Sequence, residues 1–147
     1  MTPERWIPGR AAILPATALA LFCPVPVSAQ ETPVVPRKIE IVADHDSRYK
    51  IEGMKQPEII VKAGEAITLR IIARKAKHAN REGAIHGFTL LRVKDQKAVP
   101  GWDFSLMPGT QEFAVVAPQE PGEYVVICTV ICSEDHEGMR MKFVVQP

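Results

Sequence analysis

The chain has 147 residues, a length that suits a single domain. Its charges are nearly balanced, with 18 Lys and Arg residues against 17 Asp and Glu residues and a formal net charge of +1 at pH 7. A nucleic-acid-binding protein would show a basic excess, so the charge balance argues against that class.

The N-terminal residues 1–29 have the pattern of an export signal peptide. Arg5 and Arg10 supply positive charge, residues 11–22 are largely apolar, and Val27-Ser28-Ala29 forms a small-residue cleavage site. Cleavage would release a periplasmic or secreted protein, and membrane tethering by an uncleaved segment is the alternative. Cleavage would also remove two basic residues and one acidic residue, which leaves 16 of each. We expect no transmembrane segment in the mature chain.

The remaining chain divides into a Pro-rich leader, residues 30–36, which we expect to be extended and mobile, and a domain over residues 37–147. Short β-rich runs separated by turn residues predict seven or eight strands, the pattern of an all-β sandwich. These runs cover residues 37–43, 49–52, 57–62, 66–73, 84–93, 112–117, 124–127 and the stretch after Met139.

Three connections between these runs bear on the architecture. The turn at Ala63-Gly64-Glu65 makes its two flanking strands either a hairpin or a switch between sheets. Residues 74–83 form a polar loop whose basic side chains belong to a solvated face or meet an acidic redox partner. Residues 102–107 lie between two Pro-Gly pairs, which predicts a loop.

The most informative stretch is Cys128 to Met139, which contains two thiols, an imidazole and a thioether. Soft sulfur ligands select Cu(I), Zn or iron–sulfur clusters, and a weak axial Met is a feature of cupredoxin copper. An apolar run ends at Cys128 and an alternating run follows Met139, so these ligands should lie on a loop between two strands of one sheet. His86, at the start of another apolar strand, offers a second imidazole. A plain disulfide between Cys128 and Cys132 is the alternative in an exported protein.

The spacing Cys-x3-Cys-x3-His-x2-Met, with the upstream Pro-Gly-x-Tyr strand and Ile-His-x-Phe, resembles the CuA domain of cytochrome c oxidase subunit II. Nitrous oxide reductase carries a similar domain. The resemblance covers roughly residues 57–145 and implies a cupredoxin-like Greek-key β-sandwich with a dinuclear copper site. It departs from the oxidase pattern at Val130, because oxidase subunits usually carry Glu at that position.

The resemblance also implies a set of copper ligands. Cys128 and Cys132 would bridge two copper ions through both thiolates. One ion would take His86 and Met139. The other would take His136 and the backbone carbonyl of Val130.

We therefore predict an exported, copper-binding electron-transfer protein and not an enzyme, with a cytochrome c-like protein or an oxidase or reductase as its redox partner. We expect a monomer or a weak dimer. The alternatives are a periplasmic copper chaperone or storage protein, a mononuclear cupredoxin with one copper, and an accessory subunit of a respiratory oxidase or denitrification enzyme.

Overall fold

The computed structural model describes residues 35–147. The predicted signal peptide and residues 30–34 of the predicted leader lie outside the described residues, so both remain predictions. Among the described residues no helix is long and apolar enough to cross a membrane.

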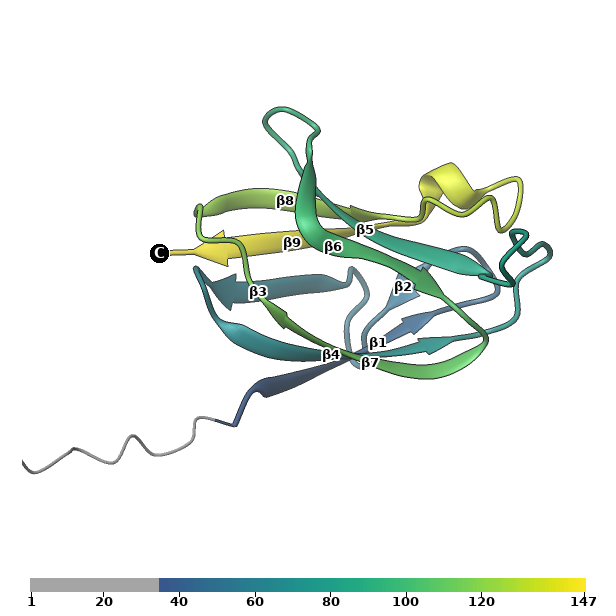
Figure 1. The fold of residues 1–147 in the computed structure, drawn as a ribbon, viewed down its shortest axis with the longest axis horizontal. Helices are drawn as coiled ribbons and strands as arrows, with labels where there is room; N and C mark the ends of the chain where they lie inside the picture. The colour runs from purple at the N-terminus through teal and green to yellow at the C-terminus, as the bar shows by residue number, and fades with distance from the viewer. Residues whose placement is uncertain (1–34) are drawn as a thin grey trace, which may run out of the picture. The chain divides into compact units, whose positions relative to one another are not determined.

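The described residues form nine strands and one short 3-10 turn (Figure 1). The elements are β1 Arg37–Ala43, β2 Tyr49–Lys50, β3 Glu58–Lys62, β4 Ala66–Ala73, β5 His86–Arg92, β6 Ala98–Leu106, β7 Gly109–Val116, β8 Gly122–Ile127, η1 His136–Gly138 and β9 Arg140–Gln146.

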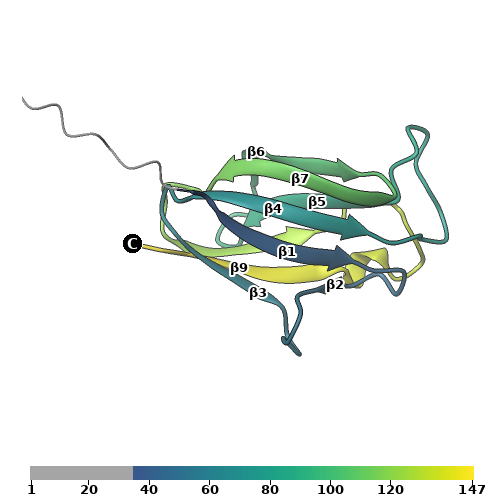
Figure 2. The same ribbon diagram turned by 90° about the horizontal axis from the view of Figure 1, so that it is seen from below.

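The strands form two sheets that face each other, as Figure 2 shows from below. The smaller sheet has the order β2-β1-β4-β7 and the larger has the order β3-β9-β8-β5-β6. β1 pairs in parallel with β4, and β3 pairs in parallel with β9. The predicted all-β sandwich is confirmed, with nine strands in place of seven or eight because β6 was not expected.

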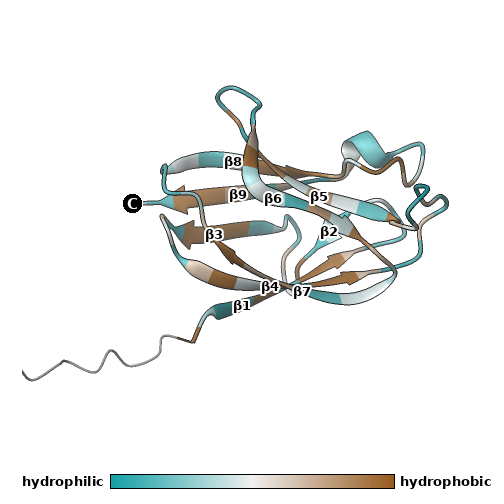
Figure 3. Cartoon of the chain, viewed as in Figure 1, coloured by the Kyte–Doolittle hydropathy of each residue, from teal (hydrophilic) through white to brown (hydrophobic). Residues whose placement is uncertain are grey.

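The core lies between the sheets, where alternate strand residues point inward. In β4 the residues Ile67, Leu69 and Ile71 are buried, and Thr68, Arg70 and Ile72 between and after them are half-buried. Phe88 of β5 and Phe143 of β9 are fully buried in the opposite sheet. Figure 3 shows strongly apolar stretches in strands of both sheets, among them β4 and β9.

The connection at residues 63–65 is a switch between sheets, because β3 belongs to the larger sheet and β4 to the smaller one. Gly64 has a φ of 70° in this turn, a left-handed conformation that glycine adopts without steric cost. Of the two alternatives that the sequence left open, the structure shows the sheet switch.

The prediction of a loop at residues 102–107 is wrong, because β6 runs through it and pairs with β5. Trp102 and Leu106 are buried by the alternation of this strand. β6 is the outermost strand of its sheet, so Pro100 can lie in it without removing a hydrogen bond from a central ladder. The Pro-Gly pairs hid a strand that tolerates them only at the edge.

The loop between β1 and β2 is held by a buried carboxylate, Asp44, whose side chain is 4% exposed. Its oxygens accept hydrogen bonds from Lys50 Nζ at 2.6 Å and from the His45 backbone N–H and ring Nδ1 at 2.8 and 2.7 Å. Burial by itself would raise the pKa of Asp44. The hydrogen bonds from Lys50 and His45 outweigh burial and hold this pKa well below its usual range.

We predict that Asp44→Asn lowers the free energy of unfolding at pH 7 by about 1–3 kcal/mol, because it removes the charged acceptor of these bonds. The folded pKa lies below the unfolded value of about 3.9, so the stabilisation is present above about pH 4 and is lost as the pH falls further. Urea unfolding of both proteins at pH 7 and at about pH 3 should therefore show a difference that shrinks in acid.

Asp46→Asn is the matched control, because Asp46 also pairs with Lys50 at 2.6 Å but its side chain is 40% exposed. Exposed ion pairs contribute about 0–1 kcal/mol, so this variant should stay close to the wild type. A difference between Asp44→Asn and the wild type that grows in acid would contradict the prediction.

Candidate metal centre

The predicted ligand loop joins two neighbouring antiparallel strands, β8 and β9, as the sequence indicated. The backbone N–H of Cys128 donates to the Met139 carbonyl at 3.2 Å, so the two ends of the loop are tied together. β5 lies on the other side of β8, and His86 is its first residue. This strand order brings an imidazole from another part of the chain to the base of the loop.

His86, Cys128 and Cys132 form one buried group of three donors whose ligand atoms all lie within 4.8 Å of one another. The two sulfur atoms are 3.7 Å apart and both cysteines are free. A disulfide has a sulfur–sulfur bond of about 2.05 Å, so the structure has two thiols in contact and not a disulfide. With metal–sulfur bonds of about 2.3 Å, two sulfurs at this spacing can both bind one ion.

His86 is fully buried, and its ring is oriented by one hydrogen bond. Nε2 lies 3.1 Å from the carbonyl oxygen of Arg74, and because a carbonyl only accepts, Nε2 carries the hydrogen. Burial lowers the pKa of His86, which favours the neutral ring. Nδ1 then has a free lone pair, and it has no hydrogen-bond partner among the described residues. A second ring nitrogen bonded to a carbonyl is typical of a metal-ligating His.

Cys128 is buried beside two backbone groups. The Gly87 N–H donates to its sulfur at 3.2 Å, and its thiol donates to the Val130 carbonyl at 3.2 Å. Burial, with the nearby Cys132, raises the pKa of Cys128 to about 11, so the free site holds a protonated thiol. A metal ion that binds here displaces this proton. The Val130 carbonyl oxygen then lies next to the sulfur with its lone pairs available.

The remaining predicted ligands are placed differently. Met139 is fully buried at the end of the loop. His136 begins the turn η1 and is half-buried, with Nδ1 donating to the Ser133 carbonyl at 3.0 Å. Because Nδ1 carries the hydrogen of this bond, Nε2 is the ring nitrogen of His136 whose lone pair could bind a metal ion. The structure thus brings together His86, Cys128 and Cys132, with the Val130 carbonyl beside them, and leaves His136 outside the three-donor group.

Several supporting residues were not found from the sequence. A Cβ at Gly87 would lie 2.4 Å from Thr129 Oγ1 and 2.7 Å from the Thr129 backbone nitrogen, so only glycine permits the loop to approach β5 this closely. A glycine inside a strand is a known signal of close backbone approach.

A second support comes from the loop that precedes β2. Ser47 is buried with a φ of 58°, and its hydroxyl lies 2.5 Å from Ser133 Oγ and 3.9 Å from Cys132 Sγ. The Cys132 carbonyl also accepts a hydrogen bond from the His78 backbone N–H at 3.1 Å. Cys132 is therefore fixed from two distant segments that no local sequence pattern connects to it.

No family model matches the sequence, and no curated protein matches it. Solved structures do resemble it. Auracyanin A, a "blue" copper protein from the green thermophilic photosynthetic bacterium Chloroflexus aurantiacus, is 21% identical with a TM-score of 0.52, over 76% of this chain and 100% of its own. Auracyanin B is 16% identical with a TM-score of 0.51, over 79% and 94%. Rusticyanin from Thiobacillus ferrooxidans is 18% identical with a TM-score of 0.50, over 76% and 79%.

The described domain has a cupredoxin fold. The likeness lies in the fold, and the chemistry of the site depends on the residues of this chain. Two thiols and a buried imidazole with a free lone pair form a donor group of the kind that suits copper. The loop that carries the two thiols connects β8 and β9, two interior strands of the larger sheet.

We predict that Gly87→Ala disrupts the centre, because its Cβ would lie 2.7 Å from a backbone atom that cannot move without shifting the ligand loop. Overpacking of this kind typically lowers the free energy of unfolding by about 1–3 kcal/mol. Denaturant unfolding of the metal-free protein measures this loss, and metal titration measures the accompanying loss of affinity.

Gly138→Ala is the control, because a Cβ at Gly138 meets nothing within 4 Å although it lies in the same loop. It should fold and bind metal like the wild type. If Gly87→Ala did so too, the close packing of the loop on β5 would not be needed for the centre.

Proposed function

We propose that this cupredoxin domain is a copper-binding electron carrier with a dinuclear, CuA-like centre. The observation that carries the proposal is the pair of reduced, buried thiols 3.7 Å apart, next to an imidazole whose Nδ1 has no other partner. A single thiolate would suffice for one copper ion. A second sulfur in contact with the first lets both bridge two ions.

In this proposal Cys128 and Cys132 would hold both copper ions through their thiolates. His86 and Met139 would serve as ligands of one ion, and His136 and the Val130 carbonyl as ligands of the other. Bound copper supplies one-electron chemistry by changing between its +1 and +2 states. The protein contributes burial, which excludes water, and fixed donors, which change little in position when the charge changes. The turn η1 has to bring His136 toward the sulfur pair when copper binds.

The same proposal covers the place and the partners of the protein. A signal peptide over residues 1–29 would direct export, and the copper centre would exchange electrons with a cytochrome c-like protein or with an oxidase or reductase. We propose a carrier and not an enzyme, because the donor group is enclosed and its members serve as ligands.

A mononuclear centre is the second candidate, and two observations favour it. His136 lies outside the three-donor group, and auracyanin A, which shares the fold, is a "blue" copper protein. In this case one copper ion would be bound. Cys128 would support Cys132 and would not be required for the optical spectrum of the copper centre.

We expect two copper ions per purified protein, with an electron paramagnetic resonance spectrum that shows hyperfine coupling to two copper nuclei. Cys128→Ser removes one of the bridging sulfurs and should lower the content to one copper or less and abolish the dinuclear spectrum. The measurements are metal analysis with optical and paramagnetic resonance spectra of both proteins.

His78→Ala serves as the control, because His78 donates to the Cys132 carbonyl through its backbone N–H while its imidazole is exposed. One copper with a mononuclear spectrum, unchanged in Cys128→Ser, would assign the second candidate. Rapid loss of copper to a weak chelator without a reversible redox couple would instead indicate copper delivery or storage.

A further inference from the structure

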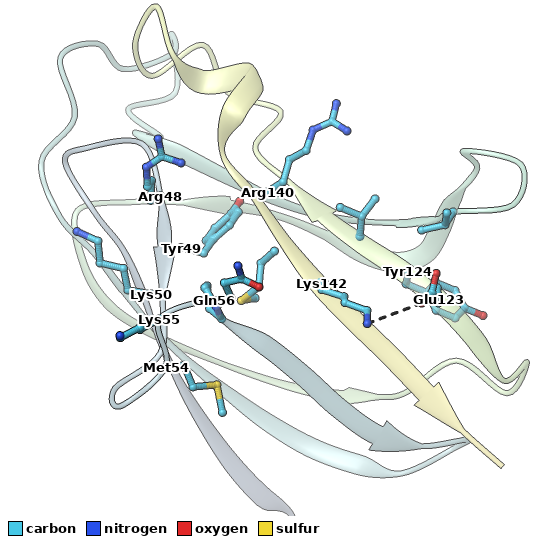
Figure 4. Close-up of a pocket in the computed structure, with 14 residues that line it drawn as sticks. Arg48, Tyr49, Lys50, Met54, Lys55, Gln56, Glu123, Tyr124, Arg140 and Lys142 are labelled. Atoms are coloured by element: carbon cyan, nitrogen blue, oxygen red, sulfur yellow. Dashed lines mark ion pairs between the residues drawn. The ribbon is translucent and has the colours of Figure 1, made fainter.

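A groove of about 540 Å³ runs along the side of the domain between the β2 region and strands β8 and β9 (Figure 4). Its lining contains five cationic side chains and a single carboxylate, that of Glu123. We call it the basic groove. Its cationic residues are Arg48, Lys50, Lys55, Arg140 and Lys142.

Two of these cations are neutralised within the protein and three are not. Lys50 pairs with Asp44 and Asp46, and Lys142 pairs with Glu58 at 3.0 Å and with Glu123 at 3.7 Å. Within residues 35–147, Arg48, Lys55 and Arg140 form no ion pair with a carboxylate. Their exposed charges therefore remain available to an external anion.

The inner wall of the basic groove includes Tyr49, which is only 2% exposed. Its hydroxyl donates a hydrogen bond to the Gly87 carbonyl oxygen. Burial holds the pKa of Tyr49 well above its usual value, so the hydroxyl keeps its hydrogen. The Gly87 N–H donates in turn to Cys128 Sγ at 3.2 Å. One residue and two hydrogen bonds thus join the groove wall to a sulfur of the centre.

We propose that the basic groove is the docking surface for the acidic face of a one-electron redox protein, and that Tyr49 and Gly87 form the electron route between this surface and Cys128. The proposal rests on the electron-carrier function argued above. One electron would pass from the copper centre to the partner's redox group, which raises the oxidation state of the centre by one and lowers that of the partner by one. Transfer in the opposite direction would reverse both changes. No bond is formed or broken and no proton is transferred.

Two features favour an acidic protein over a small ligand. The unpaired cations of the groove come from two segments of the chain, at positions 48 and 55 and at position 140. A protein surface can meet all three at once, and complementary charge raises the rate of such encounters. The route also starts where the partner would sit, at Tyr49 in the wall of the groove. It consists of covalent and hydrogen bonds, through which electrons pass more readily than across empty space.

The basic loop at residues 74–81 is the rival surface. It exposes Arg74, Lys75, Lys77 and Arg81, and its backbone contacts the centre through the Arg74 carbonyl and the His78 N–H. The test must therefore distinguish the groove from this loop. A charge-reversed pair in each surface provides matched variants, Arg48→Glu with Lys55→Glu and Lys75→Glu with Lys77→Glu.

The first measurement maps anion binding and does not depend on the copper content. Hexacyanochromate(III) is a redox-inert, paramagnetic trianion that broadens nuclear magnetic resonance signals near its binding site. We expect broadening of the amides around residues 48–56 and 140–142, lost in the groove variant and kept in the loop variant. Broadening confined to residues 74–81 would overturn the proposal.

The second measurement follows oxidation of the reduced, copper-loaded protein by hexacyanoferrate(III) in stopped flow. At low ionic strength the groove variant should react about tenfold more slowly, because it loses electrostatic attraction, while the loop variant stays near the wild type. The difference should vanish at high salt. A rate that responds only to the loop variant would overturn the docking assignment.

Tyr49→Phe tests the route separately. It removes the hydroxyl bond to Gly87 but no charge, so hexacyanochromate broadening should be unchanged while the saturated electron-transfer rate falls severalfold. An unchanged saturated rate would exclude the route. Copper content and spectra recorded for each variant identify any that have lost the centre itself.

A failure to bind copper would overturn the proposed function and leave the anion map standing, so the two failures can be told apart. Sedimentation with phosphatidylserine-containing vesicles tests the alternative that the basic groove binds an anionic membrane surface. If the wild type bound these vesicles, the groove variant did not, and the stopped-flow rates were equal, the groove would serve a membrane surface and the proposal would be wrong.

Discussion

The pairing of β8 with β9 on one side and with β5 on the other is the constraint on which the centre depends. It ties both ends of the Cys128–Met139 loop through the hydrogen bond between the Cys128 N–H and the Met139 carbonyl. It also sets His86 and Gly87 against that loop. A loop whose ends are held together loses less conformational entropy when its side chains are fixed, so the pairing of the strands helps to order the candidate ligands.

The buried polar groups of the candidate centre lower the stability of the metal-free protein. A buried acceptor without a partner costs about 1–3 kcal/mol, and Nδ1 of His86 is in that position within the described residues. Burial also holds Cys128 in its protonated form. Such groups persist where many other contacts hold the surrounding structure in place, and here the packed core of the sandwich provides those contacts. A bound metal ion would satisfy the free lone pair and would add its binding free energy to the stability of the fold.

The sequence predicted what depends on local patterns. Alternation in β4 and β9 and the apolar run before Cys128 gave the strands that flank the loop, and the spacing of the soft donors indicated a metal centre. It failed where a fold-level context overrides a local signal. Pro100 and the Pro-Gly pairs argued against a strand, yet β6 exists because an edge position tolerates them.

The supporting contacts of the centre could not be read from the sequence for a related reason. Ser47 is 85 residues from Cys132, and Gly87 is 41 residues from Cys128. The Arg74 contact uses a backbone carbonyl, an atom that every residue has, so no residue type reports it. Contacts of this kind depend on which strands pair, and the pairing is known only once the sandwich is assembled.

The segment from Asp44 to Tyr49 shows how the surface and the centre are joined. In the sequence most of it is a polar loop. In the fold it places Ser47 against Cys132 and Tyr49 against Gly87, so it contacts the two cysteine sulfur atoms directly or through one residue. The buried Asp44 holds this segment through Lys50, whose side chain also lines the basic groove. One cation of the basic groove, Lys50, and the segment that supports the thiols are therefore both held by one carboxylate. In the proposed electron carrier, such a connection would keep the distance between partner and metal fixed while the metal changes its charge.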